Sequence, residues 1–198
     1  MPGFEEVQRY LTGLWLLVRN EAEGFAWLDF SLQGTFRSFW AIVWCLPAMA
    51  VTWASWRMFY LANMPAGTAT GPSFFVKLLL IDLVCWLLPL LLIAAIARPL
   101  GFSRALGPIV VATNWLSLPL SYAMVIPAVL RLLISDSEEF TSLLWLLLLV
   151  GAIAALFRLL KMITGNQTLL AAAITAIFIL PPMMVGDVLQ RLLGIIPG

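Results

Sequence analysis

The side chains of this chain that could do chemistry are few, and their types limit that chemistry. The 198 residues contain no histidine, which excludes a His-ligated metal or haem, a histidine general base and a Ser-His-Asp triad. The two cysteines, Cys45 and Cys85, are too few for a Cys-rich zinc or iron–sulfur site, and we expect them to act as small apolar fillers. The sequence therefore predicts no metal site, no cofactor and no enzymatic activity.

Charged residues inside apolar runs are the chemically distinctive groups, because each one left to lipid costs about 3 kcal/mol or more. Counted at 1.5 Å per residue, Arg57 lies roughly 8 Å and Asp82 roughly 12 Å from the same side of the membrane. This arithmetic predicts an Arg57–Asp82 ion pair, with Lys77 as a competing partner and with Arg131 and Asp187 at the same level. These five residues, the charge cluster, are either a structural network that fixes helix register or an ion or substrate path.

A second concentration of polar chemistry lies in residues 105–133. Its polar and helix-breaking residues include Asn114, Ser117, Pro119, Ser121 and Tyr122. Each internal proline frees a carbonyl that a nearby side chain or water must satisfy, so we expect this helix to be kinked and to face protein. Broken helices form binding sites in some transporters, whereas more often a kinked helix only shapes the bundle.

Long apolar runs must position these residues. Hydrophobic residues make up 63% of the chain, and 11 Lys and Arg with 10 Asp and Glu are too few for a soluble exterior. A helix needs about 20 mostly apolar residues to cross a bilayer. Five runs meet this requirement: 38–62, 74–97, 105–133, 139–162 and 167–190. We therefore expect an all-α membrane protein, a bundle of five transmembrane helices.

The chain divides into an N-terminal segment, 1–36, and a membrane domain, 37–198. Apolar residues recur in the N-terminal segment at steps of three and four: Phe4, Val7, Leu11, Leu14 and Val18. This period predicts an amphipathic helix of about 16 residues. We expect the helix to lie in the cytoplasmic membrane interface, to pack on the bundle and to be anchored by Trp15. Docking of a protein partner is the alternative.

Basic residues indicate the orientation of the bundle. With the N-terminus in the cytoplasm, that side receives Arg9, Arg19, Arg37, Arg98, Arg104, Arg158 and Lys161. The opposite side receives Arg57, Lys77, Arg131 and Arg191. The positive-inside rule then predicts a cytoplasmic N-terminus, and an odd number of spans puts the C-terminus outside.

The layout resembles the Ypt-interacting-protein (Yip) family of five-span membrane proteins, in the compact form found in bacteria. The resemblance covers nearly the whole chain and rests on the amphipathic N-terminus, the five closely spaced spans and the stretch NWLSLP at 114–119. Residues 29–36 (DFSLQGTF) lie where family members often have an Asp-Leu-x-Gly-Pro-like entry to the first span, although the spacing here is longer and the proline is missing. The resemblance implies a bacterial inner-membrane location. The Rab-linked role of eukaryotic members belongs to their long cytoplasmic N-terminus and is not carried over.

Three functions remain open. The first, which the resemblance favours, is a non-enzymatic multi-pass protein that organises membrane or protein partners. The second is a small transporter or channel that uses the charge cluster and the kinked third span. The third is an accessory subunit of a larger membrane complex. We expect the lipid bilayer and other membrane proteins, or a second copy, as partners, and a net charge of +1 gives no basis for nucleic-acid binding.

Overall fold

The computed structural model describes residues 2–63, 71–134 and 137–195, and these residues form an all-helical structure. The prediction of five spans is confirmed, since five helices are long and apolar enough to cross a membrane. They are α3 (Ala41–Asn63), α4 (Pro72–Ala97), α5 (Ser103–Leu133), α6 (Glu138–Ile163) and α7 (Thr168–Leu192). The first span also includes the short helix α2 (Leu32–Ser38), from which α3 is separated by two turn residues.

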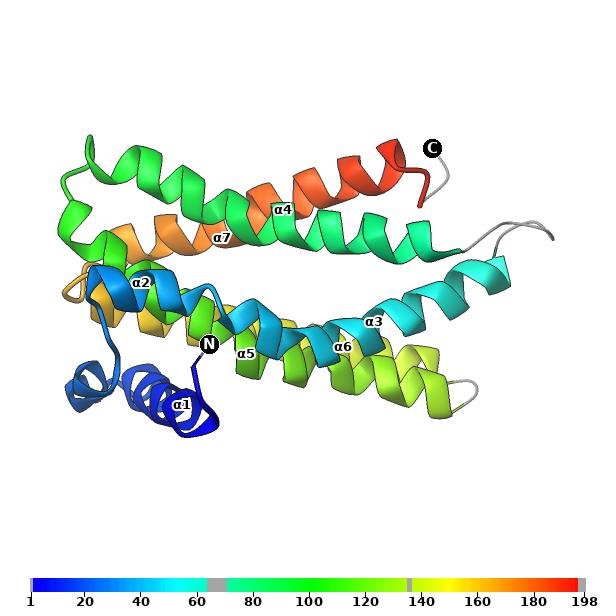
Figure 1. The fold of residues 1–198 in the computed structure, drawn as a ribbon, viewed down its shortest axis with the longest axis horizontal. Coiled ribbons are helices and arrows are strands. Elements are labelled where there is room, and N and C mark those ends of the chain that lie inside the picture. The colour runs from blue at the N-terminus through cyan, green and yellow to red at the C-terminus, as the bar shows by residue number, and fades with distance from the viewer. Residues whose placement is uncertain (1, 64–70, 135–136, 196–198) are drawn as a thin grey trace.

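The five long helices form two groups along one common axis (Figure 1). In the first group α5 packs against both α3 and α6, and in the second α4 packs against α7. The α6–α7 contact and a smaller α4–α5 contact join the two groups. Among the described residues, the first span and α4 meet through large side chains, such as Phe39–Trp86 in the turn before α3 and Tyr60–Phe74 near the end of α3. The two closest pairings, α3 with α5 and α4 with α7, therefore join helices that are not consecutive in sequence.

The apolar core has three parts that follow this grouping. The largest part joins α1 (Phe4–Val18) to α3, α5 and α6 and contains Trp115, which is 0% exposed. A second part links α4 to α7 across the bundle and contains Ile93, Ile109, Leu160 and Ile174. A third part, built on Phe74, Leu78, Ile81 and Ile195, ties the start of α4 to the chain that follows α7.

Helix α1 lies across one end of the bundle, where it is seen nearly end-on in Figure 1, and it contacts η1 (Ala22–Trp27), α5 and α6. The predicted amphipathic helix is confirmed, but its buried face differs from the expected one. The buried residues are Val7, Tyr10, Gly13, Leu14 and Leu17, whereas Phe4 is 70% exposed. The helix is rotated because the Tyr10 ring packs on Trp115, with a centroid separation of 5.0 Å. Trp15 is 63% exposed, on the side away from the bundle.

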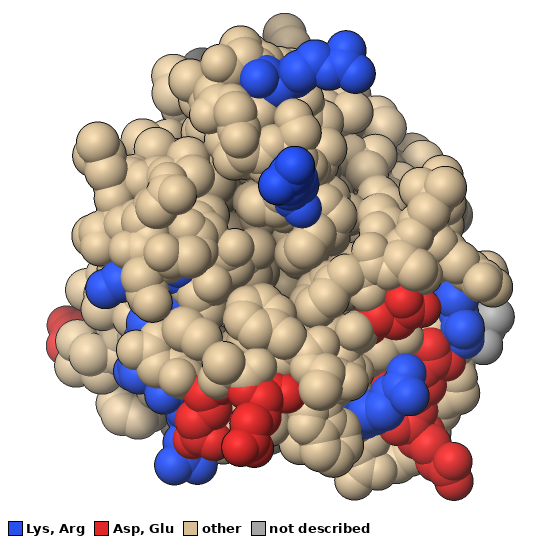
Figure 2. All heavy atoms as spheres, turned by 90° about the vertical axis from the view of Figure 1, so that its left-hand side faces the viewer, with Lys and Arg blue, Asp and Glu red and all other residues tan. Residues whose placement is uncertain are grey.

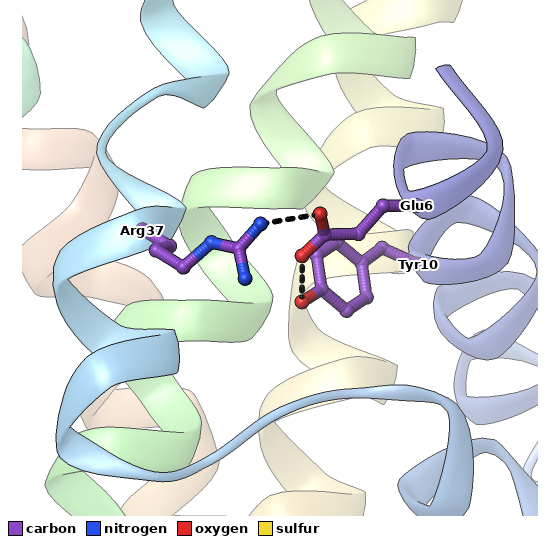
Figure 3. Close-up of polar contacts among 3 residues, drawn as sticks. All are labelled: Glu6, Tyr10 and Arg37. Carbon is purple, nitrogen blue, oxygen red and sulfur yellow. Dashed lines mark hydrogen bonds and ion pairs between the residues drawn. The ribbon is translucent and has the colours of Figure 1, made fainter. Parts of the chain in front are cut away.

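A small polar network fixes α1 to α2 (Figure 3). The Glu6 carboxylate accepts hydrogen bonds from the Tyr10 hydroxyl at 2.7 Å and from Nη2 of Arg37 at 2.5 Å. Burial and the neighbouring Glu6 carboxylate raise the pKa of Tyr10, which therefore keeps its proton to donate. Because the ion pair is partly exposed, we expect it to orient α1 more than to stabilise the fold.

This end of the bundle gathers charges of both signs. Figure 2 looks onto it and shows acidic side chains only in the lower half, where Figure 1 places α1, while basic side chains also reach the top. The turn between α4 and α5, the turn between α6 and α7, and α1 all lie at this end. The helix directions thus bring together the basic residues that the sequence assigned to one side of the membrane. Which side this is stays a prediction.

The entry to the first span is a tight turn. Ser31 caps α2, since its Oγ accepts the Gly34 N–H at 3.0 Å, and the Ser31 N–H donates to Oδ1 of Asp29 at 3.0 Å. A Cβ at Gly34 would collide with the backbone oxygen and Cγ of Asp29, so the turn has room only for glycine there. This gives the Asp29 and Gly34 positions a local structural role.

Protonation of Asp29 is expected to loosen this turn. The Ser31 hydroxyl and N–H lower the pKa of Asp29 because both stabilise its ionised form. The stabilisation is therefore present above the ordinary Asp pKa of about 3.9 and is lost as the pH falls through the lower folded value. We expect the free energy of unfolding of the wild-type protein in sodium dodecyl sulfate to be lower at pH 3 than at pH 7. The part of this difference that comes from Asp29 should be less than about 1 kcal/mol, because solvent screens the carboxylate. The loss should be absent in Asp29→Asn, and an equal pH effect in both proteins would contradict this role.

Candidate functional site

Three members of the charge cluster have separate partners among the described residues. Lys77 Nζ donates to the backbone oxygen of Leu193 at 2.7 Å, and Asp187 pairs with Arg191 at 3.0 Å. Asp82 accepts a hydrogen bond from the indole Nε1 of Trp53 at 2.7 Å. Within residues 2–63, 71–134 and 137–195 the ion pairs are Glu6–Arg37, Arg19–Glu21 and Asp187–Arg191. The structure thus gives Asp82 a different partner from the Arg57 that the sequence predicted, and it pairs Asp187 with a residue on its own helix.

Helix geometry explains the change of partner. Trp53 and Arg57 are four residues apart on α3 and lie on one face, roughly 6 Å apart along the axis. Asp82 lies deeper in the membrane than Arg57 by the sequence arithmetic, so it meets the residue one turn further in. The indole N–H is a neutral donor that reaches this depth with its ring in apolar surroundings.

Asp82 lines a cavity of about 250 Å³ between the two helix groups. The walls come from α3, α4 and α5 and from the end of α7, and they include Met49, Trp53, Trp56, Met124 and Gln190. A second cavity of about 390 Å³ shares Thr52, Trp56 and Met124 with the first and is also lined by Arg131. Asp82 and Arg131 therefore belong to adjoining cavities that have a common wall.

A third cavity, of about 190 Å³, lies further along α4 and α5 and is lined by Cys85, Trp86, Asn114, Ser117 and Phe178, among others. Asn114 is 1% exposed, and its Nδ2 donates to Oγ of Ser38 at 2.9 Å. Ser38 in turn donates to the backbone oxygen of Thr35, so the amide orientation is determined by this chain of donors. Within the described part of the chain, Oδ1 of Asn114 has no hydrogen-bond partner.

The polar residues predicted in the third span are divided among these places. Asn114 and Ser117 line the third cavity, and Ser121 lines the Asp82 cavity. The side chain of Tyr122 is 46% exposed, and its hydroxyl donates to the backbone oxygen of Trp44. Pro119 lies inside α5 as expected. The Ser117 and Ser121 hydroxyls donate to the Asn114 and Leu118 oxygens rather than to that of Trp115, the carbonyl that Pro119 deprives of its helical partner.

Three tryptophans that sequence reasoning did not assign to a site complete the cavities. Trp53 and Trp56 stand beside Asp82, and Trp86 lines the Asn114 cavity. Tryptophans in spans are usually interfacial anchors, and nothing in the sequence distinguishes Trp56 or Trp86 from anchors. The one sequence signal for Trp53 is its four-residue spacing from Arg57. This spacing puts the indole on the face of α3 that was expected to meet Asp82.

Replacing Asn114 with leucine is expected to leave stability unchanged or to raise it. Leucine has a similar volume and removes a buried carbonyl oxygen that lacks a partner in the described structure, while Ser38 keeps its bond to Thr35. We expect Asn114→Leu to lie within about 1 kcal/mol of wild type or above it in detergent unfolding. Asn114→Ala, which enlarges the cavity, should be less stable than Asn114→Leu. The reverse order would show that the amide is needed for folding.

The fold and these cavities define a multi-pass helical membrane protein with internal polar sites. A comparison with protein-family models finds no matching family, and comparisons with curated proteins and with solved structures find no match either. The resemblance to the Yip family stays a prediction from the sequence.

Proposed function

We propose that the protein is a small transporter or channel in which Asp82 is the charged group of the solute path. The supporting observation is a carboxylate ten residues inside α4 that lines a cavity between the two helix groups and has an indole as its hydrogen-bond partner. Ionisable groups at membrane depth are costly, and they mark ion and substrate paths or proton relays.

The arrangement of α5 favours a path over an isolated pocket. Asn114, Ser117 and Ser121 follow one another at steps of three and four residues and so share a helix face. Ser121 lines the Asp82 cavity, and the other two line the next cavity along the bundle. A row of polar groups thus continues from Asp82 toward the end where α1 lies. With the orientation that the basic residues predict, this row runs from the outer half of the membrane toward the cytoplasm.

Currents across protein-containing liposomes test this function. Purified protein in liposomes on a solid-supported membrane is exposed to concentration jumps of ammonium, tetramethylammonium, sodium and acetate. We expect a current for at least one of these ions that is lost in Asp82→Asn and kept in Asp187→Asn. The second variant is the control, because Asp187 is an exposed carboxylate outside the cavities. No current above protein-free liposomes for any of the four ions would refute the proposal.

The partner-organising function remains a second candidate, favoured by the low burial of α6. This helix has the smallest buried share of the five spans, and its exposed apolar residues include Phe140, Leu143, Trp145, Leu147 and Val150. Such a face is available to lipid or to another helix. Purification in a gentle detergent separates the two: stoichiometric co-purification with other membrane proteins would support an organiser or accessory subunit, and a monomer would count against both.

A further inference from the structure

We propose that the Asp82 cavity binds a small organic cation, an ammonium group bearing methyl or short alkyl substituents. This rests on the proposed function and names its substrate class. Three features of the cavity support it: its charge, the hydrogen-bonding character of its walls, and the aromatic rings that line it.

The charge of the cavity favours a cation as the ligand. Among the described residues that line it, Asp82 is the one Asp, Glu, Lys or Arg side chain. Trp53 engages Oδ2 of this carboxylate, which leaves Oδ1 as the oxygen that can meet a ligand. Lys77, which is five residues earlier on α4, donates instead to the Leu193 oxygen, and Arg131 lies on the adjoining cavity. A carboxylate in an apolar enclosure is stabilised by a cation that binds next to it.

The hydroxyl donors and the Trp53 indole donor around this carboxylate are already engaged. The Thr52 hydroxyl donates to the Ala48 oxygen and the Ser121 hydroxyl to the Leu118 oxygen, while the Trp53 indole N–H donates to Asp82 itself. Each hydroxyl oxygen keeps its lone pairs as acceptors, and the Gln190 amide has an acceptor oxygen as well as its N–H groups. An anion would compete for the engaged hydroxyl and Trp53 indole donors and would lie next to a like charge, whereas an ammonium group meets the free side of the carboxylate.

Aromatic and thioether groups make the cavity suited to an alkylated cation rather than a metal ion. Trp53 and Trp56 contribute indole rings, and Met49 and Met124 contribute polarisable sulfur. Cation–π attraction is strongest for tryptophan and is how aromatic cages bind quaternary ammonium groups. A volume of about 250 Å³ is large enough for such an ion. Among the described residues, groups of three or more metal-ligating side chains are absent, which also favours an organic cation.

Binding to the purified protein in dodecyl maltoside tests the inference, with tetramethylammonium as the probe. Tryptophan fluorescence and isothermal titration should give one saturable site, and the probe should raise the unfolding temperature of the wild-type protein. Asp82→Asn should weaken binding at least about tenfold, and Asp187→Asn should not. Trp53→Phe keeps a ring and should retain most of the affinity, whereas Trp53→Leu should lose it. The neutral isostere tert-butanol should show no saturable binding.

The outcomes separate this inference from the proposed function. Equal affinity in Asp82→Asn, equal binding of tert-butanol, or stabilisation of the wild-type protein by acetate but not by tetramethylammonium would overturn the inference. The shift of the wild-type unfolding temperature by tetramethylammonium requires no variant, so it tests the inference even if a substituted protein fails to fold. Asp82-dependent currents of sodium without tetramethylammonium binding would refute the inference and leave the function intact. Asp82-dependent binding without any current would do the opposite.

Discussion

Replacing Trp115 with alanine is expected to lower the free energy of unfolding by about 3–5 kcal/mol, the range for large buried aromatic residues. Trp115 is fully buried in the core that joins α1 to the bundle, and its ring packs on Tyr10. The substitution would open a cavity between α5 and α1 that neighbouring side chains fill only in part. Titration with sodium dodecyl sulfate in mixed micelles, followed by circular dichroism, measures the loss.

Trp15→Ala is the matched control for this experiment. It removes a side chain of the same type from the face of α1 that points away from the bundle. Exposed substitutions away from such contacts change stability by about 0.5 kcal/mol or less. Because α1 depends on Trp115, trypsin should also cleave at Arg19 faster in Trp115→Ala than in wild type. A loss of stability no larger than that of Trp15→Ala would mean that α1 is held mainly by other contacts.

A side chain at Gly24 is expected to separate η1 from α1. A Cβ at Gly24 would run into the backbone oxygen of Gly13 and would lie 2.7 Å from Cγ of Leu17. The opposing Gly13 is equally confined, because a Cβ added there would lie 2.6 Å from Cβ of Trp27 and 2.9 Å from the Gly24 oxygen. Since backbone atoms form part of each obstacle, repacking of side chains cannot relieve the contact. We expect Gly24→Val to cost about 3 kcal/mol, the upper end for overpacked sites, in the same unfolding assay.

Gly151→Ala is the control for Gly24. A Cβ at Gly151 meets no described atom within 4 Å, so alanine there should leave stability unchanged or raise it through helix propensity. The expected sign of the Gly24 effect is thus opposite to that of a glycine in open space. Wild-type stability in Gly24→Val, with an unchanged trypsin cleavage rate at Arg19, would show that the two segments do not pack as closely as the structure places them.

The N-terminal helix shows how far local pattern carries a prediction. Its period and length follow from the apolar residues, but the buried face could not be read from hydrophobicity alone. Tyr10 and Leu17 are buried and Phe4 is exposed, since the position of Trp115 on α5 selects which residues face the bundle. A polar-tipped aromatic can be buried because Glu6 accepts a hydrogen bond from its hydroxyl group.

The charge cluster shows a second limit. Counting residues along a helix assigns Asp82 a level in the membrane, yet it does not identify the partner of that carboxylate. It leaves open which neutral or charged side chain on the facing helix reaches the same level. Trp53 and Arg57 are both on the expected face, and the hydrogen bond to Trp53 depends on how closely α3 and α4 approach at that turn.

The membrane class and the exclusion of histidine chemistry follow from the composition, and the five spans and the amphipathic start follow from the order of the residues. The spans and the amphipathic start depend on the free energy of transferring each residue from water to lipid. These free energies can be summed along the chain without knowledge of the fold. The packing of α4 on α7, the Trp53–Asp82 hydrogen bond and the polar cavities between the helix groups become visible only in the folded chain. Helices inside a bilayer gain no hydrophobic energy by meeting, so their pairing depends on side-chain fit and interhelical hydrogen bonds, which belong to pairs of helices and not to any one of them.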